Sequence, residues 1–372
     1  MAKIDNYICN VCIFSMAFFV VTFSTTSFAV TLQHQFASPI TGEYETNPQM
    51  SSSDEKSVTR KVVTPSYGIS AIDGRNTWFS DLAVRVERSS DQEVSINRED
   101  PTLNMGWEHE LDRGIFTLTG RYDEKSTRVS ELEDTGQIFS DGTRKSQSLS
   151  STYQESINER MALTFNAQYD SISYSGGDLT DYNAPSANVS FNYLWSERFE
   201  PFIQLSISRY EPSKDLVDTS FYSGDIGFNW IVSQQFDLSS QLGTNHISGG
   251  SSDTDWQGLI NATYTKNLTE TSIELSRSLS PSGSGGYLKS ERIKFDWQYD
   301  INENITTGLN INFIKNQSET LTFGAWYKYE LTRSWFMKLN AEHREREEAG
   351  SRTVTTTNQL ISATLEYNFS NI

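Results

Sequence analysis

The stretch ANVSFNYLWSERFEPFIQLSIS, residues 187–208, alternates apolar and polar side chains twice. Apolar residues occupy every second position from Ala187 to Trp195, and the alternation resumes at Ile203, Leu205 and Ile207. Side chains of a strand point to opposite faces in turn, so the stretch predicts two antiparallel strands joined by a tight turn. Aromatic residues crowd that turn, namely Tyr193, Trp195, Phe199 and Phe202.

The same alternation runs through most of the chain. It gives fifteen strands from about Thr102 to Phe369, and ITGEYETN (40–47), VVTPSYGIS (62–70) and WFSDLAVRVE (78–87) supply three more. Tight turns recur with a period of about 35 residues, but the period of 2 within each unit excludes a helical-repeat solenoid. We predict about 18 strands, or 16 if the first hairpin is misread.

The connections between strands alternate in length. Short turns fall near Arg113, Glu159, Arg198, Gln234, Thr269, Glu303 and Arg333, and longer connections rich in Gly, Ser and Asp separate them. Bacterial transmembrane barrels have short periplasmic turns and longer extracellular loops. The pattern therefore predicts an all-β, antiparallel, up-and-down transmembrane barrel with both termini on the periplasmic side.

Composition supports a barrel surrounded by lipid. Hydrophobic residues make up 36% of the chain, below the roughly 45–50% of globular proteins, yet aromatic residues reach 12%. A soluble sandwich or propeller would alternate too, but it has no reason to gather aromatic residues at one end. We predict a periplasmic aromatic girdle of Trp107, Tyr193, Trp195, Phe199, Trp230, Phe236, Tyr264, Tyr299, Tyr329, Trp335, Tyr367 and Phe369, and we expect Phe202 at the same rim.

The first 29 residues have the pattern of a cleavable signal peptide. Lys3 precedes an apolar run from Val11 to Phe23, and SFA at 27–29 offers small residues for cleavage after Ala29. The barrel would then occupy residues 30–372 of the cell outer membrane. Both cysteines, Cys9 and Cys12, lie in the leader, so we expect no disulfide, thiolate catalysis or Cys-ligated metal in the mature chain.

The net charge of −18 argues against a nucleic-acid partner, which requires a basic face. Acidic loops keep an exported protein soluble, and they could also bridge to lipopolysaccharide through divalent cations. Ser130–Gly142 is the best candidate for such bridging. The expected partners are therefore outer-membrane lipid and lipopolysaccharide.

The sequence offers little chemistry for catalysis. A rim lipid hydrolase would use a His–Ser pair, and His246 with Ser248 or His343 with Glu345 are the available neighbours. Such neighbours occur by chance in a Ser-rich chain. The four histidines have no metal-ligand spacing, and we expect no enzyme activity, metal or cofactor.

Residues predicted to point inward from the alternating strands would line the lumen. The candidates are Arg85, Glu108, Arg121, Asp123, Lys294, Asp296, Asp300, Trp326, Lys328, Glu330, Phe336, Lys338 and Glu342. Both signs of charge occur, so no single-sign ring is expected. Trp326 and Phe336 could stack on sugar faces, or they could pack an inward-folded loop.

Three stretches resemble known families. ATLEYNFSNI (363–372) resembles the C-terminal signal read by the barrel-assembly machinery, although Thr364 stands where that signal commonly has Gly. EYETNP (43–48) and residues 276–301 resemble porins associated with exopolysaccharide and PEP-CTERM export clusters. The resemblance implies a barrel near polysaccharide-export components and transfers no catalytic residue.

These observations predict a passive or accessory conduit for hydrophilic solutes or exopolysaccharide. The alternative is a non-conducting anchoring barrel with its lumen plugged by a loop, for which Ser130–Gly142 is the candidate. A gated transporter with a globular plug is not expected, because only about ten residues separate Val30 from the first predicted strand.

Overall fold

The computed structural model describes residues 30–135, 141–176, 179–213, 216–249, 252–348 and 354–371. The leader with Cys9 and Cys12 lies outside the described residues, so the predicted cleavage after Ala29 stays a prediction. Among the described residues, no helix has the length and apolarity needed to cross a membrane.

Nineteen strand segments and one described helix, α2 (Thr127–Thr135), make up the fold. The strands are β1 (Thr31–Glu45), β2 (Val58–Val63), β3 (Ser66–Asp73), β4 (Asn76–Ser89), β5 (Arg98–Leu111), β6 (Gly114–Ser126), β7 (Thr143–Asn158), β8 (Met161–Ser175), β9 (Tyr182–Tyr193), β10 (Phe199–Pro212), β11 (Thr219–Ser233), β12 (Phe236–Ser248), β13 (Asp253–Lys266), β14 (Thr269–Pro281), β15 (Tyr287–Asn302), β16 (Ile305–Lys315), β17 (Ser318–Thr332), β18 (Trp335–Glu348) and β19 (Val354–Asn371).

β2 and β3 are two parts of one barrel strand. Both pair with β1, where Val63 faces Ile40 and Ser66 faces Ala37, so the register continues across the interruption. The interruption falls at Thr64 and Pro65, because proline lacks the N–H that a ladder requires. The molecule is therefore an all-β, 18-strand closed antiparallel barrel, which confirms the predicted fold class.

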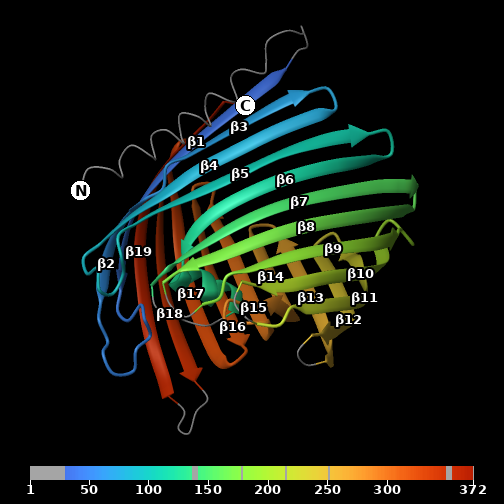
Figure 1. Ribbon diagram of the computed structural model, residues 1–372. Helices are drawn as coiled ribbons and strands as arrows, with labels where there is room; N and C mark the ends of the chain where they lie inside the picture. Colours follow the sequence, from blue (N-terminus) through green and yellow to red (C-terminus); the bar gives the residue numbers. More distant parts are fainter. Residues whose placement is uncertain are drawn as a thin grey trace, which may run out of the picture.

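The ring closes between the first and last strands (Figure 1). β1 pairs with β19 over twelve residue pairs, from His34 opposite Asn371 to Glu45 opposite Leu360. Each remaining strand pairs with its sequence neighbour, so the described strands leave no open sheet edge.

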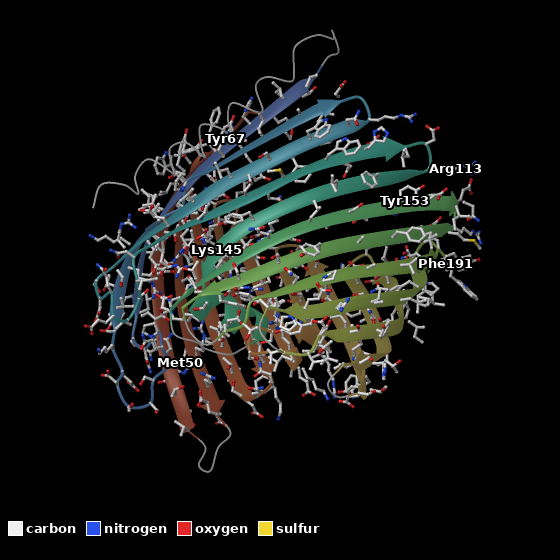
Figure 2. The ribbon with its side chains drawn as sticks, viewed as in Figure 1. Met50, Tyr67, Arg113, Lys145, Tyr153 and Phe191 are labelled. Carbon is white, nitrogen blue, oxygen red and sulfur yellow. The ribbon has the colours of Figure 1, made fainter. Side chains whose placement is uncertain are left out.

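The two ends of the barrel differ. One end, here called the turn end, carries both ends of the described chain and short turns such as Asp112–Arg113; the other is the loop end. Figure 2 places Arg113 and Met50 at these opposite ends. Two expectations were wrong. β1 begins at Thr31 rather than near Ile40, and a two-residue connection, Asn316–Gln317, lies at the loop end, so the alternation of short and long connections is not strict.

The outer face of the barrel is apolar and exposed. Ile226, Leu242 and Leu205 are 63%, 58% and 57% exposed, respectively. The predicted girdle residues gather near the turn end, where Phe199 faces Trp230 and Trp335 faces Tyr367. Trp78, which the prediction omitted, stacks on Trp107 with ring centroids 5.3 Å apart. A water-soluble protein does not expose a continuous apolar band of this kind.

Large inward side chains lie over glycines of the neighbouring strands. Phe202, placed at the rim from its closeness to the turn, instead faces Gly227 on the inner side of the barrel. Phe79 lies over Gly106 and Trp326 over Gly308 in the same way. A Cβ at Gly227 would approach both Phe202 Cζ and the Ser240 carbonyl oxygen at 2.4 Å. The missing side chain is what lets the ring lie along the wall.

We expect Gly227→Ala to lower the free energy of unfolding in detergent by about 1–3 kcal/mol, the usual cost of an overpacked site. The Ser240 carbonyl is backbone and cannot move out of the way. Gly42→Ala is the matched control, because no atom lies within 4 Å of its added Cβ. Equal stability of the two variants would contradict this explanation of the inward glycines.

Candidate functional site: a constricted lumen

The strand register places the predicted lumen residues on the inner face. Lys328 lies opposite Lys338, Glu330 opposite Phe336, and Asp296 opposite Asn310. The remaining candidates on that face are Arg85, Glu108, Arg121, Asp123, Lys294, Asp300, Trp326 and Glu342. Most of them are paired: Arg121 with Asp123 at 3.2 Å, Lys294 with Asp296 at 3.0 Å and Lys328 with Glu330 at 3.3 Å.

Helix α2 lies inside the barrel rather than on its surface. Figure 1 shows it in teal within the outline of the strands. Thr127, Ser130 and Glu131 are 0%, 2% and 1% exposed. The Tyr174 hydroxyl on β8 donates to Glu131 at 2.9 Å, and Arg128 reaches Glu45 on β1 at 3.2 Å. The helix thus joins two distant parts of the wall.

Arg128 belongs to a buried network of ion pairs through its contact with Glu45. Arg60 contacts Glu45 at 2.5 Å and Glu43 at 2.9 Å, and Arg85 contacts Glu87 at 2.8 Å. Burial lowers the pKa of the Arg128 guanidinium, while the neighbouring Glu45 carboxylate opposes this shift. Three arginines and three glutamates balance each other, which is the condition for burying charges at tolerable cost.

Arg98 binds the chain between α2 and β7, where it contacts Asp141 and Gly142. Arg98 binds both carboxylate oxygens of Asp100, at 2.9 and 3.1 Å, and donates to the Gly142 carbonyl at 2.8 Å. Asp141 lies 3.4 Å from Arg98 and accepts from the backbone N–H of Ile96 at 2.9 Å. Glu131 and Asp141 are therefore engaged in contacts inside the protein, and the lipopolysaccharide bridging considered for Ser130–Gly142 stays a prediction. Residues 136–140 of that stretch lie outside the described residues.

The connection between β14 and β15, Ser282–Gly286, also folds inward. The Thr180 N–H donates to the Gly283 carbonyl at 2.7 Å, and the Tyr210 hydroxyl donates to the Ser282 backbone carbonyl at 3.3 Å. Gly285 and Gly286 have φ of 103° and 80°, which permits the sharp reversal. A small apolar cluster includes Tyr210 and consists of Ile172, Tyr182, Ala184 and Tyr210. Tyr174 and Tyr287 pack against this cluster.

These inward segments occupy part of the lumen. One cavity of about 440 Å³ is lined by residues of β7–β9 and also by residues of β14 and β15, which lie behind them in Figure 1. Arg144 and Asp170 come from the first wall and Arg292 from the second. Serines complete the lining, namely Ser146, Ser276, Ser278, Ser280 and Ser290. Such a lining hydrogen-bonds water and small polar solutes.

The histidine pairs considered for hydrolysis lie elsewhere. His246 and Ser248 share the outer face of β12, and His246 Nδ1 lies 3.0 Å from Thr254 Oγ1. His343 also lies on the outer face, opposite Phe323. In the part of the chain that the structure describes, no group of three His, Cys, Asp or Glu side chains is placed to hold a metal ion.

Several residues of the lumen are absent from the candidates predicted from the sequence. Arg144 and Arg292 stand at inward positions of strands, so the period of 2 could have identified them. Arg128 and Glu131 gave no such signal, because they belong to a short helix whose contacts are made with distant strands.

Comparisons with known proteins bear on the fold alone. Neither known protein families nor curated proteins give a match. Among solved structures, Acinetobacter baumannii OccAB4 is similar with a TM-score of 0.53 and 7% identity, covering 93% of this chain and 100% of that one. Pseudomonas aeruginosa OccK2 (OpdF) has a TM-score of 0.53, 8% identity and coverage of 92% and 98%, and OccK9 (OpdG) has 0.51, 9%, 91% and 98%.

We expect Arg128→Gln to loosen α2, because it removes one partner of a buried ion pair. Amide hydrogen exchange in residues 127–135 should accelerate at least about tenfold, the effect of 1.4 kcal/mol on a local opening. Lys56→Gln is the control, since Lys56 pairs with Asp54 and Glu93 at the exposed surface. Unchanged exchange in Arg128→Gln would show that the helix is held by other contacts.

Proposed function

We propose that this protein is an outer-membrane channel of the porin type for small hydrophilic solutes. The proposal depends on one observation: a closed 18-strand barrel combines an apolar outer face with a polar lumen that α2 and Ser282–Gly286 enter. Barrels of 16 to 18 strands enclose a water-filled passage. The inward segments would restrict that passage to small solutes.

The placement in a membrane follows from the outer face. Hydrocarbon offers no hydrogen bonds, and a closed barrel is one of two spanning structures that satisfy every backbone group internally. The aromatic side chains near the turn end suit a lipid–water boundary, and the short turns at that end support placing it in the periplasm. Export by residues 1–29 and insertion by the barrel-assembly machinery are parts of the same proposal.

The constriction favours selection over free diffusion. OccK2 (OpdF) was solved in complex with glucuronate and OpdK with vanillate, so these two barrels of similar fold accept small solutes. OpdK covers 91% of this chain with a TM-score of 0.51 at 9% identity. With so little identity, the likeness supports a solute channel and leaves the solute open.

The alternative of a non-conducting, plugged barrel has a specific observation in its favour, the buried seat of α2. A link with polysaccharide export has no support from the comparisons. Glu43 and Glu45 of the EYETNP stretch form ion pairs with Arg60. The Ser282 carbonyl, within residues 276–301, accepts a hydrogen bond from Tyr210. Both stretches therefore have structural roles inside the barrel. The rim hydrolase has no observation in its favour.

Conductance in planar bilayers tests the proposal. The wild-type protein should conduct, and replacing Val129–Thr135 by a short Gly-Ser linker should raise the conductance, by about twofold if α2 blocks half of the passage. A Gly-Ser replacement of the exposed residues Ser52–Glu55 is the control. Conduction only after removal of α2 would favour the plugged barrel, and no conduction by either protein would reject the channel.

Charge at the constriction gives a second test. We expect Arg144→Gln and Arg292→Gln each to shift the reversal potential in a KCl gradient toward cations, because a lumen charge acts on passing ions at short range. Lys145→Gln removes the same charge from the adjacent position of β7, where the side chain pairs with Glu124 on the outer face. An equal shift for Lys145→Gln would contradict the assignment of the lumen.

A further inference from the structure

A second cavity lies on the opposite part of the inner wall from Arg144. It has a volume of about 450 Å³ and spans β15 to β19 and β1. Its lining consists of Thr41, Glu43, Asp296, Asn310, Trp326, Lys338, Asn340, Glu342, Ser362 and Thr364. Binding sites for small molecules typically have this size and combine one apolar surface with a few polar groups.

The register explains the flat position of Trp326. One row across the sheet runs from Gly308 through Trp326 and Asn340 to Ser362 and Glu43. A Cβ at Gly308 would lie 2.5 Å from Trp326 Cε2, so the indole occupies the space that a side chain would fill. The ring therefore lies along the wall as a platform, rather than across the lumen.

Asn310 repeats this arrangement one row away. It lies over Gly324, where a Cβ would approach its Oδ1 at 2.2 Å. Around the indole the wall carries amides and hydroxyls, and Thr41 and Thr364 hydrogen-bond each other at 2.9 Å. Hydroxyls and amides both donate and accept hydrogen bonds, as the recognition of a polyhydroxylated solute requires.

Each carboxylate of this site has a cation beside it, and Lys338 adds one positive charge. Glu342 pairs with Arg344, Asp296 with Lys294 at 3.0 Å, and Glu43 with Arg60 at 2.9 Å. Lys338 lies over the Trp326 ring with its ammonium 5.3 Å from the centroid. Since each carboxylate has a cation beside it, the cavity offers strong hydrogen-bond acceptors without a large net field that would select a charged solute.

We propose that this cavity is a binding subsite for an uncharged sugar ring. The C–H face of the sugar stacks on Trp326, where it displaces the Lys338 ammonium from the ring, and its hydroxyls bind Asn340, Ser362 and the paired carboxylates. This subsite rests on the proposed channel function and names the class of solute. It is separate from the arginine-lined constriction, because no residue lines both cavities.

Sugar-dependent block of the ion current tests the subsite. D-Glucose and maltose should reduce the current of the reconstituted protein in a saturable way, whereas glucuronate and glucosamine should block more weakly. Trp326→Ala should raise the half-blocking maltose concentration by about three- to tenfold, the usual worth of an aromatic contact. Trp326→Phe should keep part of the affinity.

Phe202→Ala is the matched control, since Phe202 is also an inward aromatic ring over a glycine but does not line this cavity. It should leave sugar block unchanged. A channel that conducts ions but shows no sugar block, stronger block by glucuronate, or equal loss in Phe202→Ala and Trp326→Ala would overturn the subsite. Absence of any ion current would instead reject the channel function.

Discussion

The structure depends on the closure of the backbone hydrogen-bond ring. A strand within hydrocarbon cannot leave N–H or C=O groups unpaired, so a sheet turned to lipid must join its own edges. The pairing of β1 with β19 does this over twelve residue pairs. Once the ring is closed, each residue faces either outward or inward. The apolar exterior and the polar lumen are therefore consequences of the same constraint.

Closure alone would leave an open tube, and the character of this lumen comes from polar contacts made inside it. The arginine–glutamate network binds α2 to β1 through Arg128 and Glu45, and the Tyr174 hydroxyl binds it to β8 through Glu131. Tyr210 and Thr180 hold Ser282–Gly286 from a third position. Buried ion pairs add little net stability but fix geometry, which suits a constriction that has to keep one shape.

Much of this architecture could be predicted from the sequence, because a period of 2 reports directly on the two faces of a strand. The alternation of side chains along the strands predicts that Trp326 and Phe336 point inward, and the strand register places them on the inner face. The same alternation also points Phe202 inward, although its closeness to the turn led to the prediction that it lies at the rim. β1 was shortened because residues 31–39 alternate weakly, and its true length is set by pairing with β19.

The interior segments could not be predicted in the same way. The α2 sequence, TRVSELEDT, has no distinct apolar stripe, and its contacts involve residues such as Glu45 that are 83 positions away. Ser282–Gly286 resembles any polar loop until Thr180 and Tyr210 are brought beside it. Local patterns carry no information on such long-range contacts.

Site-specific labelling along β10 tests the central claim most directly. In a chain with Cys9 and Cys12 replaced by serine, single cysteines at Leu205, Ser206 and Ile207 would be reconstituted in lipid vesicles. The account predicts that Cys at 206 reacts with a water-soluble thiol reagent, whereas fluorophores at 205 and 207 are quenched by lipid-attached quenchers. Equal aqueous labelling at all three positions would contradict a barrel with lipid outside and water within.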